Sequence, residues 1–164
     1  MSKNIETTRR LVELQGFYGV ADQDLRPIDI GLRVAPVFCM TLSAIATATG
    51  SANLFWTLLP FALAGIVLNG NPFDVVYNHG LRYWLKGPRI PRYPVPRRFA
   101  CGVAALFTLS AALSFQYGWN LAGQIIGASL ALAALVPVII GFCIPSFVLR
   151  LVTGKVRIHW VVNA

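Results

Sequence analysis

The sequence predicts an all-α membrane protein with four transmembrane helices in two hairpins, cytoplasmic termini and amphipathic segments at the membrane interface. The 164 residues are 56% hydrophobic and only 12% charged, whereas a soluble domain carries about 25% charged residues. Two long stretches, residues 34–73 and 99–149, contain no charged side chain. Each stretch is too long for one span of roughly 20 residues, so we expect each to contain two.

Turn-forming residues divide both stretches near the middle. The breaks read TGSAN in the first stretch and YGWNLAG in the second, and Gly, Ser and Asn favour tight turns. Helices are expected because an open sheet leaves backbone groups without partners in lipid, and no alternation of the barrel type occurs. The whole chain, 1–164, is then one domain with spans near 34–50, 53–69, 99–117 and 121–142.

The basic residues predict the orientation. All 14 Lys and Arg side chains precede the first span, lie in the central loop 71–98 or follow the last span. Four spans place these three segments on one side, and short loops rich in Lys and Arg remain cytoplasmic. The net charge of +8 therefore predicts contact with anionic headgroups. It does not predict nucleic-acid binding, which needs a basic face with base-reading or stacking groups.

The central loop, NPFDVVYNHGLRYWLKGPRIPRYPVPRR, alternates aromatic and basic residues before a run of prolines. We predict an interfacial helix over residues 73–86, because Trp and Tyr favour the headgroup level. The prolines predict an extended path back to the membrane. The side chains expected to contact headgroups or a partner subunit are Phe73, Tyr77, Arg82, Tyr83, Trp84 and Lys86.

The two ends of the chain carry weaker patterns. Apolar residues at roughly helical spacing over residues 5–18 predict a second surface helix. The segment KVRIHWVV, residues 155–162, alternates apolar residues with polar or smaller ones, which predicts a short extended tail. The polar N-terminus has no cleavable signal pattern, so we expect the first span to act as an uncleaved insertion signal.

No cofactor or metal site is predicted. His79 and His159, the two histidines, both lie outside the spans, and no charged residue lies within them. Proton relays and ion sites in membranes are built from such residues, so transport of a charged substrate by a carrier is disfavoured.

Cys39, Cys101 and Cys143 all lie within about 10 Å of the predicted cytoplasmic boundary, at 1.5 Å per residue. They could therefore approach one another from three helices. No CxxC or zinc-type spacing occurs. One interpretation is that these cysteines pack as small apolar residues. The other is that they are reactive thiols, which requires a nearby cation; Arg98 or Arg150 could supply it.

Small residues recur on the fourth predicted span. Gly123, Gly127 and Ala131 form a ridge of the small-xxx-small type, which lets helix backbones approach closely. We expect this ridge to pack within the bundle; contact with a partner protein is the alternative.

Three motifs, FDVVYNHGLR, PRRFACG and CIPSF, lie within residues 71–150. With them the chain resembles a family of small bacterial integral membrane proteins described as domain of unknown function 4395. The resemblance implies a four-helix, multi-pass protein of the bacterial inner membrane with no established activity. Some members resemble dithiol proteins associated with sulfur or thiol-redox partners. Ser146 stands here where those members have their second cysteine, which leaves Cys143 a monothiol role or a mixed disulfide with a partner.

The sequence favours a non-catalytic accessory or scaffold subunit, packed against other membrane protein subunits of a larger inner-membrane complex. The alternative is a thiol- or sulfur-handling membrane protein that uses Cys143. A channel or transporter for a small neutral or anionic species ranks third. We expect Pro145 to kink or end the last helix, Cys143 to pack there, and Ser146 to bond a freed backbone group.

Overall fold

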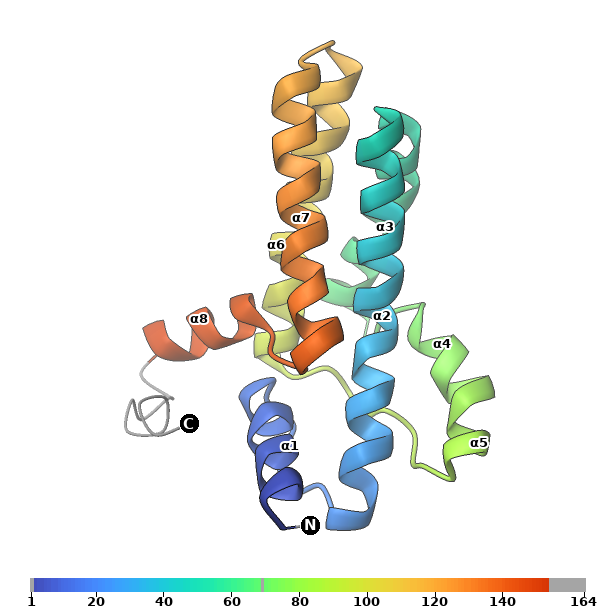
Figure 1. The fold of residues 1–164 in the computed structure, drawn as a ribbon, viewed down its shortest axis with the longest axis vertical. Helices are drawn as coiled ribbons and strands as arrows, with labels where there is room; N and C mark the ends of the chain where they lie inside the picture. The colour runs from blue at the N-terminus through green and yellow to red at the C-terminus, as the bar shows by residue number, and fades with distance from the viewer. Residues whose placement is uncertain (1, 69, 154–164) are drawn as a thin grey trace.

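The computed structural model describes residues 2–68 and 70–153, and two helical hairpins dominate them (Figure 1). Helices α2 (Asp22–Thr49) and α3 (Ala52–Val67) form the first hairpin, and α6 (Val95–Gln116) and α7 (Asn120–Ile140) form the second. Helix α3 packs mainly against α6, and α2 packs mainly against α7. No strand occurs in the described part of the chain, so the predicted all-α fold is confirmed there.

Helices α2, α6 and α7 are long and apolar enough to cross a membrane. The chain is therefore a helical membrane protein. Helix α3 coincides with the predicted second span and is apolar, but it has only 16 residues. At 1.5 Å per residue this corresponds to about 24 Å, which is shorter than the hydrocarbon core of roughly 30 Å.

Helix α2 is longer than the predicted first span, because it starts at Asp22 and not at residue 34. A charge-free stretch marks only the part of a helix that suits lipid. The three preceding turns of α2 are charged, and three of these charges are paired: Asp22 accepts a hydrogen bond from Arg9, and Asp29 binds Arg33. These turns extend α2 beyond the bundle at the end that we call its base, where α1 and α8 pack (Figure 1).

Helix α7 coincides with the predicted fourth span, near 121–142, to within two residues at each end. Helix α7 stops at Ile140, and Gly141 then adopts a positive φ of 72°, a conformation that suits glycine. A separate helix, α8 (Ile144–Val152), follows across the base and was not predicted. Pro145 lies in its first turn, where the missing N–H costs nothing. The prediction that Pro145 kinks or ends a helix is therefore wrong, because this residue helps to begin one.

The predicted surface helices do form. Helix α1 (Ser2–Leu14) covers most of the N-terminal pattern. Helices α4 (Asp74–Val76) and α5 (Arg82–Leu85) are joined by the π-helical turn η1 (Tyr77–Leu81), so residues 74–85 form one helical arm. An extended path through residues 88–94 follows, as predicted. The predicted tail at residues 155–162 lies outside the described residues.

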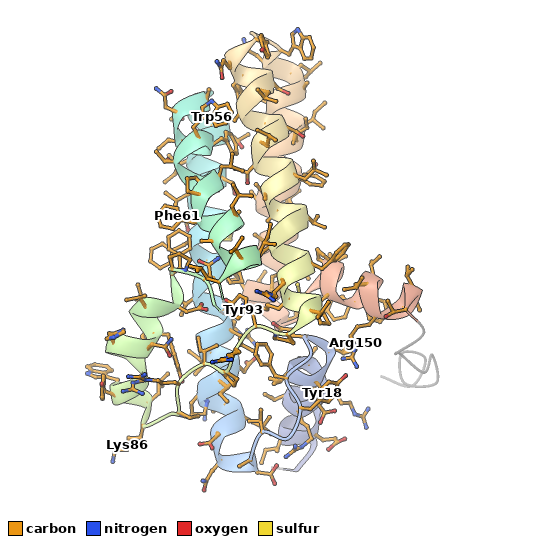
Figure 2. All side chains as sticks on the ribbon, turned by 180° about the vertical axis from the view of Figure 1, so that it is seen from behind. Tyr18, Trp56, Phe61, Lys86, Tyr93 and Arg150 are labelled. Atoms are coloured by element: carbon orange, nitrogen blue, oxygen red, sulfur yellow. The ribbon has the colours of Figure 1, made fainter. Side chains whose placement is uncertain are left out.

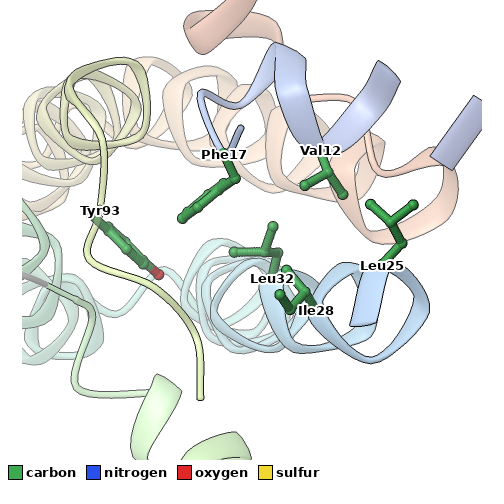
Figure 3. Packing of buried hydrophobic residues seen from close by; sticks show 6 residues of the cluster. All are labelled: Val12, Phe17, Leu25, Ile28, Leu32 and Tyr93. Carbon is green, nitrogen blue, oxygen red and sulfur yellow. The ribbon is translucent and has the colours of Figure 1, made fainter. Parts of the chain in front are cut away.

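Two hydrophobic clusters stabilise this arrangement. The upper cluster lies within the bundle and consists of Ala46, Phe55, Ala111, Ala112, Phe115 and Leu130. The lower cluster joins α1 and its following turn to α2 and to the extended path, as Figure 3 shows. It consists of Val12, Phe17, Leu25, Ile28, Leu32 and Tyr93. The lower cluster thus fixes the N-terminal helix against the base of the bundle.

Candidate functional site

A cavity of about 310 Å³ lies between the long helices in the lower part of the bundle. Cys39 on α2, Cys101 on α6 and Cys143 at the start of α8 all line it. Cys101 lies within electrostatic range of both other thiols. The structure therefore places the three cysteines, which are 104 positions apart from first to last, around one cavity.

The turn at Gly141, which ends α7, determines the position of Cys143. The chain changes direction at Gly141. Cys143 is therefore the residue immediately before α8, and its backbone is extended. Its carbonyl accepts the first hydrogen bond of that helix, from the Phe147 N–H at 3.0 Å. The thiol thus lies at the N-terminus of a helix, where the peptide dipoles stabilise negative charge.

Ser146 is fully buried and links Cys143 to α6. Its hydroxyl oxygen lies 3.0 Å from the Pro96 carbonyl and 3.2 Å from the Cys143 sulfur. A hydroxyl has one proton, so it donates either to Pro96 or to the sulfur. When Cys143 is a neutral thiol, the sulfur can donate to Ser146, which in turn donates to Pro96. Ser146 therefore does bond a backbone group, as predicted, although that group belongs to another segment.

The guanidinium of Arg97 lies beside the thiols and is almost completely buried, with 5% of the residue exposed. Its Nη2 donates to the Leu32 carbonyl at 2.5 Å, and its Nη1 donates to the side-chain oxygen of Gln15. It lies within electrostatic range of Cys101 and Cys143. We expected the cation near the thiols to be Arg98 or Arg150, so this expectation is corrected to Arg97.

Arg98 and Arg150 point to other partners. Arg98 donates to the Val67 carbonyl at 2.9 Å. Arg150, on α8, donates to the Glu13 carbonyl and to the Tyr18 hydroxyl. Figure 2 shows Arg150 and Tyr18 close together where α8 meets the N-terminal segment. Arg150 therefore fastens α8 to the N-terminal segment and does not serve the cavity.

Gln15 completes the wall behind Arg97. Its side-chain oxygen accepts from Arg97, and its nitrogen donates to the Gly141 carbonyl at 2.9 Å. One buried amide thus connects α1, α6 and the end of α7. Sequence reasoning missed Gln15 because an amide in a polar segment has no distinguishing pattern. It missed Arg97 because the residue was counted among the loop charges, although its position just after Pro94 and Pro96 marks the first turn of a span.

Tyr93 and Asp74 form the polar edge of the site. Tyr93 lines the cavity, and its ring lies 5.1 Å from the Arg97 guanidinium carbon. Burial raises the pKa of Asp74 above its ordinary value of 3.8, while Tyr93 and Arg97 act in the opposite direction. Burial also raises the pKa of Tyr93. The Tyr93 hydroxyl and the Asp74 carboxyl interact, although neither that hydroxyl nor Oδ1 of Asp74 makes a hydrogen bond of ordinary geometry among the described residues.

The predicted partner-contact residues divide into two groups. Tyr83 and Trp84 are 63% and 92% exposed, and Arg82 stacks on the Tyr83 ring, 4.5 Å from its centre. Lys86 is exposed too, at the end of the arm (Figure 2). These four residues are available for contact.

The other two residues face inward, which corrects the prediction for them. Tyr77 is fully buried, because Gly31 on α2 leaves room for its ring; a Cβ at that glycine would lie 2.9 Å from the ring. Phe73 stacks between Phe38 and Phe61, with ring centres 4.8 and 4.6 Å away. Helices α2 and α3 thus provide the surface against which these two side chains are packed. The sequence alone did not indicate this contact.

The small residues of α7 pack inside the bundle. A Cβ at Gly127 would collide with Thr47 and would lie 2.9 Å from Phe55, whereas one at Gly123 would lie 2.9 Å from the Phe115 ring. Ala131 continues this row and is partly buried. Within residues 2–68 and 70–153, no group of His, Cys, Asp and Glu is arranged to hold a metal ion.

Comparison with known proteins agrees with the resemblance seen in the motifs. Curated proteins and solved structures gave no match. A family model described as domain of unknown function (DUF4395) matches residues 29–153, which include all three cysteines, Arg97 and Ser146, while α1 and Gln15 precede the match. The chain belongs to the DUF4395 family.

Proposed function

We propose that this chain is a membrane-embedded thiol protein that carries out thiol–disulfide exchange at Cys143. The observation that carries the proposal is that all three cysteines line one cavity together with the buried guanidinium of Arg97. Cysteines that only fill space as small apolar residues have no reason to gather beside a buried cation.

Cys143 is the best candidate for the reacting thiol. It lies at the N-terminus of α8, within electrostatic range of Arg97 and 3.2 Å from the Ser146 hydroxyl. Each of these groups stabilises a negative sulfur, and the thiolate is the nucleophilic form. Cys39 and Cys101 lie inside helices α2 and α6, so neither occupies the start of a helix.

The proposed step needs no redox cofactor. The Cys143 thiolate attacks one sulfur of a disulfide R–S–S–R′ and forms a bond to it, while the R–S–S–R′ bond breaks and R′–S⁻ leaves with the electron pair. A second thiol, supplied by a partner, releases R by attacking the mixed disulfide. Ser146 cannot do this, so Cys143 acts as a monothiol.

The test is the alkylation rate of each cysteine in the purified full chain, followed by mass spectrometry of the labelled peptides. We expect Cys143 to react several-fold faster than Cys39, and Ser146→Ala to slow it because the sulfur loses a donor. Ser129→Ala is the matched control, since that exposed hydroxyl bonds only within its own helix. Equal rates for Cys143 and Cys39 would overturn the proposal.

A second candidate function is an accessory subunit of a larger membrane complex. The arm formed by residues 74–85 extends away from the bundle (Figure 1) and presents Trp84 at its surface. Large exposed aromatic residues frequently anchor interfaces. Trp84→Ala should reduce the protein that co-purifies after gentle extraction, whereas Trp119→Ala, at the opposite end of the bundle, should not. A lone monomer from the native membrane would contradict this candidate.

The topology proposed with both functions is four spans in the bacterial inner membrane, with both termini and the central loop in the cytoplasm. It is supported by the two hairpins, by the basic residues near the base and by the location of α1 and α8 at that end. Water-soluble maleimide should label single cysteines placed at Ser51 and Gly118 from outside the cell, and not one placed at Gly80, which is exposed and where a Cβ would meet no atom within 4 Å. Labelling at Gly80 from outside would reverse the orientation.

A further inference from the structure

The cavity beside Cys143 is lined by a buried hydroxyl whose hydrogen bonding is incomplete. Tyr93 is 95% buried, since only 5% of it is exposed, and it lines the cavity. Its hydroxyl interacts with the Asp74 carboxyl but makes no hydrogen bond of ordinary geometry within the described residues. Buried polar atoms without such a bond are rare in native proteins, so this hydroxyl is available to a ligand that enters the cavity.

The same wall carries a positive charge without a close counter-ion. The hydrogen bonds of Arg97 go to neutral acceptors, the Gln15 amide and the Leu32 carbonyl. None of the ion pairs in the described ranges includes Arg97. Asp74 acts on it only through longer-range electrostatics, and burial opposes the negative form of that carboxyl by raising its pKa. Because buried charges are normally paired, an anion would be stabilised here.

The rest of the cavity is apolar. Its walls include Ala35, Leu58, Val103, Phe107 and Leu130. A volume of about 310 Å³ falls at the lower end of the roughly 300–1,000 Å³ found for ligand pockets. A small inorganic anion would leave these walls uncovered, so the ligand has to combine one anionic group with an apolar body.

We propose that this cavity binds a medium-chain amphiphilic anion, with its carboxylate or similar head against Arg97 and the Tyr93 hydroxyl and its chain along the apolar walls. Where the ligand also carries a disulfide, it is a substrate for Cys143, and this part rests on the function proposed above. The binding of the anion itself does not depend on thiol reactivity.

Octanoate is the probe for the binding site, because it has the anionic head and the chain but no sulfur. Equilibrium dialysis against the purified, delipidated full chain, with empty micelles as blank, should show one saturable site per chain. Octanamide, which lacks the charge, should bind at least tenfold more weakly. Binding no greater than that of empty micelles, or equal binding of octanamide, would overturn the proposal.

Tyr93→Phe is the decisive variant. It removes a hydroxyl that makes no hydrogen bond of ordinary geometry within the described residues, so the fold should tolerate it. It should weaken octanoate binding about tenfold, as expected for a hydrogen bond to a charged group. Tyr117→Phe is the matched control, because that tyrosine is 68% exposed at the far end of the bundle. Unchanged affinity in Tyr93→Phe would contradict the site, and Arg97→Gln, if it folds, should abolish binding.

A lipid could supply the same chemistry as a free carboxylate. Displacement of octanoate by an anionic phospholipid, but not by a zwitterionic one, would assign the head-binding site to a lipid. Octanoate binding that persists with either phospholipid would assign it to free carboxylates.

Lipoate separates this inference from the proposed function, because it adds a cyclic disulfide to a similar anion. Attack by Cys143 would open the ring, form one mixed disulfide and leave the second sulfur as a thiolate on the ligand, which iodoacetamide can trap for mass analysis. Octanoate binding without a lipoate adduct would support the site and refute thiol exchange. An adduct that octanoate fails to compete away would support thiol exchange and refute the site.

Discussion

Gln15 and Arg97 are 82 positions apart in the sequence, yet their side chains form a hydrogen bond inside the protein. Gln15 precedes the part of the chain that matches the family, and Arg97 lies within it. The N-terminal segment therefore supplies a buried polar partner to the cavity wall of the family domain.

Replacing Gln15 with Leu should destabilise the protein by about 1–3 kcal/mol, because Arg97 loses an acceptor and the Gly141 carbonyl loses a donor, both of them buried. Titration with a denaturing detergent, followed by circular dichroism, measures this change. Gln23→Leu is the control, since Gln23 is exposed on α2 and should change stability by less than about 0.5 kcal/mol. Equal effects of the two substitutions would show that the Gln15 bonds contribute nothing.

How far the sequence predicts the structure depends on where the partners of a residue lie. Charge-free stretches and turn residues predict the long helices, because a span is a local property. The inward direction of Phe73 could not be predicted, because Phe38 and Phe61, the rings that enclose it, are distant in sequence. Likewise, the spacing of the three cysteines indicates a common depth, but only the packed bundle shows that they share a cavity with Arg97.

The Asp29–Arg33 pair provides a second prediction. Arg33 binds Asp29 at 2.8 Å and donates to the Val138 and Ile139 carbonyls at the end of α7, where a cation is favoured. Arg33→Gln should cost about 1–3 kcal/mol, since Asp29 is then buried without its partner.

Asp29→Asn together with Arg33→Gln should recover part of this loss, because no carboxylate then remains uncompensated. Arg10→Gln on exposed helix α1 is the control, and surface pairs of this kind contribute at most about 1 kcal/mol. A double variant that is as unstable as the sum of the single variants would argue against a coupled pair.

Stability should depend on pH through Asp74, whose pKa is raised by burial. A carboxyl with a raised pKa in the folded state binds its proton more tightly there than in the unfolded chain. The contribution of Asp74 to the free energy of unfolding is therefore fully present below the ordinary pKa of 3.8. It is lost as the pH rises through the pKa that Asp74 has in the folded state. Asparagine does not ionise, so Asp74→Asn should not show this pH-dependent loss of stability. The difference in the free energy of unfolding between the variant and the wild type should therefore shift in favour of the variant as the pH rises. Parallel pH profiles of the two proteins would contradict the prediction.

Gly127 and Gly80 provide a matched pair of substitutions, both from Gly to Ala within helical segments. A methyl group at Gly127 would collide with Thr47 and press on Phe55, whereas one at Gly80 would have no atom within 4 Å. Gly127→Ala should therefore separate α7 from α2 and cost about 1–3 kcal/mol, as overpacking does. Gly80→Ala should instead stabilise the arm by up to about 1 kcal/mol, because alanine loses less backbone entropy in a helix. Detergent titration of both variants measures the difference. The interhelical contact would be refuted if Gly127→Ala proved as stable as Gly80→Ala, since α7 would then not need a glycine to approach α2.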